Sequence, residues 1–175
     1  MTAIMAVERG APGAGEQFEA LYRSSAADVY AYVASMLRDR AAAEDVTSLA
    51  FERAFRRRAL FDVRRGSPRS WLFAIARNAA LDELRRRRRT GALLSDVAED
   101  ADDPDLEANL AERRVLVREG LASLAPAERE VILLKFLGRL SNAELARVLG
   151  CSESNAGTRL HRAIERLREA CGVTR

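Results

Sequence analysis

The sequence has few of the residues that build disulfide frameworks, zinc sites and β-sheets. Its 175 residues include two cysteines, one histidine and four prolines, and aromatic side chains make up 6%. Two cysteines and one histidine cannot supply the four ligands of a structural zinc site, and they allow at most one disulfide. The low aromatic and proline content argues against a β-sandwich and favours a helical protein.

Long hydrophobic runs and enzyme motifs are missing as well. No apolar stretch approaches the roughly 20 residues that cross a bilayer, and no signal-peptide core follows the first residues. The sequence has no phosphate-binding P-loop, no HExxH and no GxSxG elbow. We therefore expect a soluble, cytoplasmic protein that is not an enzyme, with no catalytic residue, no metal site and no cofactor.

Charge is distributed in three blocks along the chain. Residues 1–90 carry a net charge of +6, residues 91–112 carry −8 without a basic residue, and residues 113–175 carry +5. Two basic blocks on either side of an acidic strip are typical of two nucleic-acid-facing domains joined by an anionic linker.

Helical periodicity marks the first basic block. Apolar residues recur at helical spacing from Phe18 to Leu37, and a second helix is predicted from about Ala42 to Arg58. Ser67 is a suitable N-cap for a third helix, because Pro68 then occupies the first helical position, where its missing N–H costs little. This third helix ends in five consecutive arginines, Arg85–Arg89.

These patterns predict an all-α protein made of two small helical domains joined by an acidic flexible linker. In the second domain, Gly120 and Pro126 are predicted to interrupt the helices. The expected segments are a disordered leader at 1–15, a first domain at 16–90, the linker at 91–112 and a second domain at 113–175.

The most specific local pattern begins at Ser141. Ser141 and Glu144 have the spacing of a capping box at the start of a short helix, and Gly150 follows where that helix needs a residue with positive φ. Ser152 can cap a second helix directly afterwards. A short helix, a turn with glycine and a longer basic helix together predict a helix-turn-helix.

In a helix-turn-helix the first turns of the second helix meet base edges in the major groove of DNA. The candidate DNA-reading residues are the polar and basic ones expected on its exposed face: Ser154, Asn155, Thr158, Arg159 and Arg162. The alternative for this segment taken alone is an ordinary helical hairpin with a solvated basic face.

Residues 124–167, which include LSNAELARVLGCSESNAGTRLHRAIERL, resemble the C-terminal promoter-binding domain of bacterial sigma factors. The stretch AEDVTSLAFERAF at Ala43–Phe55 resembles the helix of that family that binds core RNA polymerase. The stretch SPRSWLFAIARNAALDELRRRRR at Ser67–Arg89 resembles the helix that melts and reads the −10 promoter element. The order and the short gap are similar to those of the small extracytoplasmic-function class of the sigma-70 family.

The resemblance implies a sigma factor that binds core polymerase and directs promoter recognition, DNA melting and initiation at a specific set of genes, in a stress or envelope response. The −35 element would be read by the five helix-turn-helix residues named above. The −10 element would face Asn78, Asp82, Arg85 and Arg86. The clamp helices of the largest subunit would meet Asp45, Val46, Phe51, Arg53 and Phe55. The flap tip of the second-largest subunit would meet Val131, Leu134 and Phe136.

The resemblance also implies an anti-sigma partner, which could hold the chain near the membrane, without membrane insertion by the chain itself. The sequence departs from the family at Gly157, where a lysine is common, and at Phe55, where tryptophan is common. Two other functions stay open at this point. One is a stand-alone helix-turn-helix regulator. The other is a helical protein that binds a protein partner through its basic faces and its dense apolar run, Val131-Ile132-Leu133-Leu134.

Overall fold

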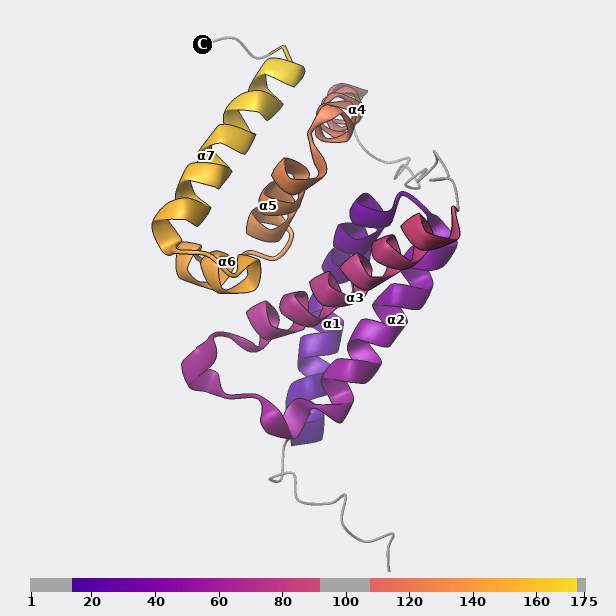
Figure 1. Cartoon of the computed structure of the whole chain (residues 1–175), viewed down its shortest axis with the longest axis vertical. Coiled ribbons are helices and arrows are strands. Elements are labelled where there is room, and N and C mark those ends of the chain that lie inside the picture. Colours follow the sequence, from indigo (N-terminus) through magenta and orange to yellow (C-terminus); the bar gives the residue numbers. More distant parts are fainter. Residues whose placement is uncertain (1–13, 92–107, 173–175) are drawn as a thin grey trace, which may run out of the picture.

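The computed structural model describes residues 14–91 and 108–172, which fold into seven α-helices and two short 3₁₀ turns (Figure 1). The α-helices are α1 (Ala14–Leu37), α2 (Arg40–Arg56), α3 (Pro68–Thr90), α4 (Ala108–Ser123), α5 (Pro126–Phe136), α6 (Asn142–Leu149) and α7 (Glu153–Ala170). The all-α prediction is confirmed. The predicted leader and linker lie largely outside the described residues, although α1 begins at Ala14 and α4 at Ala108, inside the two predicted ranges.

Helices α1, α2 and α3 form a three-helix bundle, the first half of the molecule (Figure 1). Asp39 caps α2 by accepting the Ala42 N–H, and Ser67 caps α3 by accepting the Ser70 N–H, with Pro68 at the first helical position as predicted. Buried alanines on α2 and α3 allow these two helices to approach closely. The large side chains of the core include Val29, Tyr32, Val33, Leu37, Phe51, Leu72 and Phe73.

Helices α4 to α7 form the second half, in which α7 packs against α4, α5 and α6. Helix α5 is buried on nearly all sides, because α6 and α7 cover it from its own half and α1 covers it from the other. All six residues 129–134 are buried. This explains the dense apolar run in the sequence, since a helix covered all round needs no polar face.

Gly120 does not interrupt a helix, contrary to the prediction, but lies inside α4. Its role is to allow close packing. A Cβ at this position would come within 2.7 Å of Cys171 Sγ and 3.0 Å of Leu167 Cδ1, both on the α7 side of the contact. Pro126 does separate two helices, as predicted, because it is the first residue of α5.

A cluster of charged residues joins the end of α3 to the start of α2. The Arg87 guanidinium donates to Glu83 Oε1 and to Asp39 Oδ2, each at 2.8 Å. Asp39 is the N-cap of α2, so Arg87 holds the cap of one helix to another. Glu83 also accepts two hydrogen bonds of 2.7 Å from Arg86. These bonds, from Arg86 first and then Arg87, outweigh burial and lower the pKa of Glu83 to about 2.

No helix within the described ranges is long and apolar enough to cross a membrane.

The low pKa of Glu83 predicts a specific loss of stability in acid. The folded-state pKa lies below the ordinary value of 4.5, so the stabilisation is complete above that value and decreases as the pH falls towards 2. Between pH 6 and pH 4 the wild type should lose about 1 kcal/mol more of its unfolding free energy than Glu83→Gln. Urea denaturation at the two pH values measures this difference. Glu52→Gln, which removes an exposed pair with Arg56, is the matched control, and an equal effect of both substitutions would contradict the assignment.

Candidate functional site

The helix-turn-helix forms as the sequence predicts. The Ser141 hydroxyl accepts the Glu144 N–H, while the Glu144 carboxylate accepts the Ser141 N–H, which completes the capping box of α6. Gly150 ends that helix with φ of 68°, in the left-handed region that glycine adopts without strain. Ser152 then caps α7 by accepting the Asn155 N–H. The two caps and the glycine set the angle at which α7 leaves α6.

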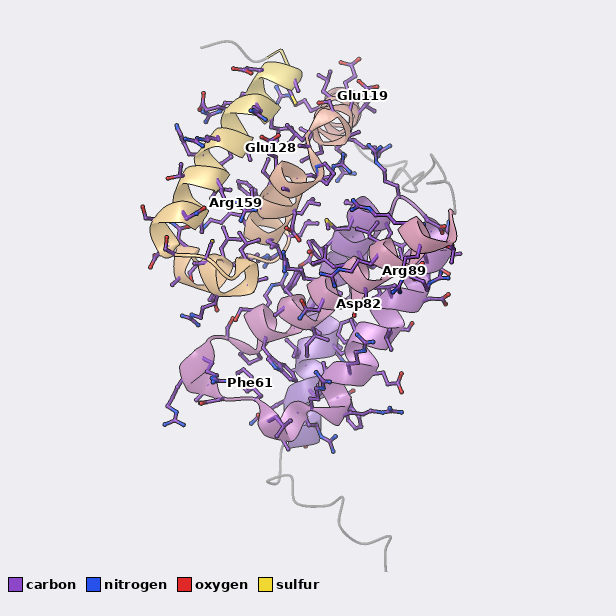
Figure 2. The ribbon with its side chains drawn as sticks, viewed as in Figure 1. Phe61, Asp82, Arg89, Glu119, Glu128 and Arg159 are labelled. Atoms are coloured by element: carbon purple, nitrogen blue, oxygen red, sulfur yellow. The ribbon has the colours of Figure 1, made fainter. Side chains whose placement is uncertain are left out.

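The five candidate DNA-reading residues lie near the start of α7, away from its buried face. Ala156, Leu160 and Ala163 point into the core, whereas the candidates Ser154, Asn155, Thr158 and Arg162 are exposed and Arg159 is half-buried. Figure 2 labels Arg159 beside the first turns of this helix. The Thr158 hydroxyl donates to the Ser154 carbonyl oxygen, so this side chain is already oriented along the helix. Neither Arg159 nor Arg162 forms an ion pair with another described residue.

Gly157 lies beside these residues and carries no side chain. A Cβ built on Gly157 would meet no atom within 4 Å. No packing contact in the described part of the molecule therefore requires glycine at position 157, in contrast to Gly120.

The −10 candidates share one face of α3. Asn78, Asp82, Arg85 and Arg86 are all exposed, and their spacing of four, three and one residues places them along one side of the helix. Asp82 lies 3.1 Å from Arg85 and 3.9 Å from Arg53 of α2. The Asp82 carboxylate thus links the −10 face to one of the residues expected to bind polymerase (Figure 2).

The arginine run divides into two groups. Arg85, Arg86 and Arg87 are paired with carboxylates of the chain, and Arg87 is buried. Arg88 and Arg89 are exposed and have no ion-pair partner among the described residues. Among the described residues of the arginine run, only Arg88 and Arg89 therefore lack a carboxylate partner. Both lie at the end of α3, and Figure 2 labels Arg89.

The residues of α2 that are expected to bind polymerase fall into an accessible group and a buried group. Asp45 and Phe55 are exposed and Arg53 is half-buried, whereas Val46 and Phe51 lie in the core of the bundle rather than on its surface. The reason is the helical period, which turns these two towards α1 and α3. Phe51 packs edge-on against Tyr22 of α1, with ring centroids 4.7 Å apart. Of these two rings, Tyr22 is the exposed one.

On α5, the structure leaves only one of the three expected contact residues accessible. Val131 and Leu134 are fully buried because this helix is covered on nearly all sides, so their side chains cannot contact another protein in this arrangement. Phe136 is 61% exposed at the end of the helix.

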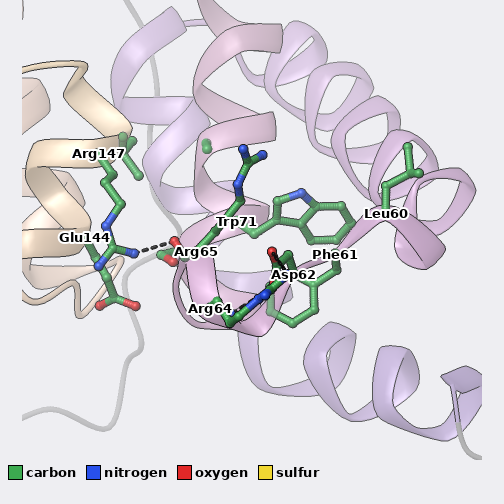
Figure 3. Close-up of a pocket in the computed structure, with 11 residues that line it drawn as sticks. Leu60, Phe61, Asp62, Arg64, Arg65, Trp71, Glu144 and Arg147 are labelled. Carbon is green, nitrogen blue, oxygen red and sulfur yellow. Dashed lines mark hydrogen bonds and ion pairs between the residues drawn. The ribbon is translucent and has the colours of Figure 1, made fainter.

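A hollow of about 620 Å³ lies between the loop that precedes α3 and helix α6 (Figure 3). Phe61 of the loop packs against Trp71 of α3 at one side, with ring centroids 5.6 Å apart. Glu144 and Arg147 of α6 line the other side, and Arg147 donates to the Arg65 carbonyl oxygen. Trp71 thus packs against the loop that precedes α3 and also borders the hollow.

Leu60 and Val63 are exposed residues that sequence reasoning misses. They lie in two 3₁₀ turns, Arg58–Leu60 and Val63–Arg65, and are the most exposed large hydrophobic residues described, at 78% and 75%. Because this loop has no helical period, no pattern in the sequence indicates which side chains face outward.

The chain matches two family descriptions in succession. Residues 21–90 match Sigma-70 region 2, which covers the bundle of α1 to α3, and residues 114–167 match Sigma-70, region 4, which covers α4 to α7.

Relatives agree with this assignment, and a solved structure shares the fold. The ECF RNA polymerase sigma factor SigL of Mycobacterium tuberculosis is 34% identical over 89% of this chain and 91% of its own length. The ECF RNA polymerase sigma factor BldN of Streptomyces coelicolor is also 34% identical, over 92% of this chain but only 62% of its own length. The sigma factor RpoE from Bartonella quintana, solved with the anti-sigma factor NepR, has the same fold. Its TM-score is 0.76 at 23% identity, over 91% of this chain and 99% of that one.

Two sigma-70 regions match in succession, and each coincides with one half of the molecule. Together with the identity to SigL over nearly the full length of both chains, this shows that the chain belongs to the extracytoplasmic-function group of sigma-70 RNA polymerase sigma factors.

Proposed function

We propose that this chain binds RNA polymerase core enzyme and contributes promoter recognition through two DNA-facing helices, α7 for the −35 element and α3 for the −10 element. The observation that carries the proposal is the exposed, capped start of α7 in a chain that also has the bundle matching region 2. A stand-alone helix-turn-helix regulator would have no need of that bundle. The chain supplies binding energy and no covalent chemistry.

At the −35 element, α7 enters the major groove with its first turns against base edges. Asn155 and Arg159 are the residues with the strongest base-reading chemistry, since amide and guanidinium groups form bidentate bonds to adenine and guanine. Arg162 lies one turn further along and meets the phosphate backbone, which fixes the position of the helix on the duplex.

At the −10 element, the exposed face of α3 binds the strand that separates. Arg88 and Arg89 neutralise phosphates, because they are the cations of the run without a carboxylate partner among the described residues. Asn78 and the Asp82–Arg85 pair lie on the same helix nearer its start, and the rings of Phe61 and Trp71 offer surfaces on which unpaired bases stack. Binding to single-stranded bases then shifts the melting equilibrium.

Two surfaces bind the polymerase. On α2, Phe55 and Asp45 contact the clamp helices of the largest subunit, next to the half-exposed Arg53. At the end of α5, the exposed Phe136 contacts the flap tip of the second-largest subunit.

The partners also include a regulator. RpoE was solved with an anti-sigma factor, NepR. We infer a comparable partner for this chain in the cytoplasm, which releases it for a stress or envelope response.

Run-off transcription tests the proposed function. Purified core polymerase with and without this chain is supplied with a pool of genomic fragments, and the transcript starts are sequenced. Stimulated starts that share spaced −35 and −10 elements are the expected result. Without stimulation or co-elution with core polymerase, the sigma role would be wrong. Tight binding to specific duplexes without core polymerase would then identify a stand-alone regulator.

Arg159→Ala should weaken binding to the −35 element by about 1–3 kcal/mol and relax the preference at one base pair. Arg168→Ala is the matched control, because Arg168 lies at the far end of the same helix and pairs with Glu165 at 2.6 Å. Competition binding of the polymerase holoenzyme to promoter variants measures both. Unchanged base preference in Arg159→Ala would remove this residue from the reading set.

The arginine run offers a second matched pair. Arg89→Ala should leave stability unchanged but reduce the salt dependence of promoter binding. The slope of log K against log salt should decrease by about 0.7 to 0.9 for each phosphate that is no longer neutralised. Arg87→Ala should lower the unfolding free energy by about 3 kcal/mol, because it leaves Glu83 and Asp39 without their shared partner. Thermal unfolding and a salt titration of binding distinguish the two. Similar behaviour of both variants would show that the division of the run is wrong.

A further inference from the structure

The hollow between the loop that precedes α3 and helix α6 has the size of a small-molecule site (Figure 3). Its volume of about 620 Å³ falls within the range of about 300 to 1,000 Å³ that is usual for ligand pockets. One wall, formed by the loop and the start of α3, belongs to the first half of the molecule, and α6 of the second half forms the other. The residues of the two walls indicate which class of molecule fits between them.

The first wall carries an aromatic surface. Phe61 and Trp71 are both half-buried, and their rings lie at 53° to each other with centroids 5.6 Å apart. The Trp71 indole N–H has no hydrogen-bond partner among the described residues, so it remains available to a polar atom of a ligand. Because both rings line the hollow, a flat heterocycle that enters it can stack on them.

Two guanidinium groups line the same hollow without a carboxylate partner. Arg65 of the loop and Arg147 of α6 are both exposed, and neither forms an ion pair with another described residue. Arg147 donates to the Arg65 carbonyl oxygen through Nη1, which leaves its Nη2 and Nε groups available. Guanidinium groups bind phosphate through pairs of parallel hydrogen bonds, so these two arginines suit a phosphate group.

The backbone of the loop is shaped to seat Arg147. Gly66 has φ of 138°, a conformation that glycine adopts readily and that other residues adopt only with strain. A Cβ at this position would come within 2.8 Å of Arg147 Nη1 and 2.7 Å of Ser70 Oγ. Glycine therefore leaves room for the guanidinium against the loop, where the bond to the Arg65 carbonyl oxygen holds it. The cation of α6 is thus fixed at the edge of the hollow.

Two carboxylates also line the hollow, but each has partners of its own. Asp62 accepts the Arg64 backbone N–H at 3.0 Å and the Arg64 Nε at 3.1 Å. Glu144 accepts the Ser67 N–H at 3.1 Å and the Ser141 N–H at 3.0 Å. Burial raises the pKa of Glu144, but the bonds from Ser67 and Ser141 together lower it to about 2. The three arginines of the lining outnumber these two carboxylates, so the hollow favours an anion.

We propose that the hollow binds a free nucleoside phosphate, whose base stacks on the rings of Phe61 and Trp71 and whose phosphate groups bind Arg65 and Arg147. Rings alone would accept many flat molecules, and cations alone would accept any anion. Together in one hollow they select a molecule with a heterocycle at one end and phosphate at the other. A nucleotide within an unpaired DNA strand has the same chemistry. The wall formed by α6 favours a ligand of one nucleotide over a continuous strand.

Tryptophan fluorescence tests the site in the full-length chain. Trp71 is the only tryptophan, so quenching of its emission reports a base at the rings. ADP and GDP should quench it saturably, and free tryptophan titrated in parallel corrects for light absorbed by the nucleotide. Adenosine and pyrophosphate each use one part of the site and should bind roughly tenfold more weakly or less than that. Absence of saturable quenching by both diphosphates at millimolar concentration would overturn the proposal.

Variants assign the two parts of the site. Arg147→Ala should weaken ADP binding roughly tenfold and leave adenosine binding unchanged, because only the diphosphate uses the guanidinium. Phe61→Leu should weaken the binding of both. Arg114→Ala is the matched control, since Arg114 is an exposed arginine of α4 outside the hollow. Circular dichroism establishes that each variant is folded. Equal weakening in Arg114→Ala, or unchanged ADP binding in Arg147→Ala, would contradict a site that includes Arg147.

A single-stranded oligonucleotide, titrated in the same way, separates the two sources of a base. It should bind the free chain more weakly than ADP at equal salt and should be less sensitive to Arg147→Ala. Tighter binding of the oligonucleotide, with the same dependence on Arg147, would identify a strand as the ligand and overturn the proposal. Neither DNA duplex nor polymerase is present in these titrations, so their outcome is independent of the proposed function.

Discussion

Helices α2, α3, α6 and α7 each begin at a side-chain oxygen that accepts a backbone N–H of the first turn, from Asp39, Ser67, Ser141 and Ser152. The rest of the structure depends on these four caps. Each one determines where a helix starts, and therefore which residues of that helix point outward. Two of the caps have a second task. Asp39 holds Arg87 at the end of α3, and Ser67 donates to Glu144 of the other half. The same groups that define the helices also fix how the helices are joined.

Arginine has two different roles in this molecule, and the sequence alone does not separate them. Arg38, Arg69, Arg77, Arg87 and Arg129 are bonded to carboxylates or helix-end carbonyls and hold segments together. Arg88, Arg89, Arg159 and Arg162 have no ion-pair partner among the described residues. Neighbours in the sequence belong to different groups, as Arg87 and Arg88 do, because successive residues on a helix point about 100° apart.

Much of this architecture is predictable because it is encoded over short distances. The caps at Ser67, Ser141 and Ser152 and the turn at Gly150 each depend on residues within four positions, and all of them form as predicted. Features that depend on distant residues are not predictable in this way. Gly120 resembles a helix breaker until α7 is seen packed against it. The family resemblance assigns Val131 and Leu134 to a contact surface, but α1, α6 and α7 cover α5 and bury both side chains. The ion pair between Arg77 of α3 and Glu130 of α5 is not predictable for the same reason, since the two residues are 53 positions apart.

Gly157 has a consequence for how this protein can change over evolutionary time. A side chain at this position would meet no atom within 4 Å, and almost any residue is a better helix former than glycine. Substitutions there add a new group next to the residues of α7 that we propose read DNA, without disturbing the core, and they stabilise the helix that carries them. Under the proposed function, promoter preference can therefore diverge at this position without a loss of fold stability.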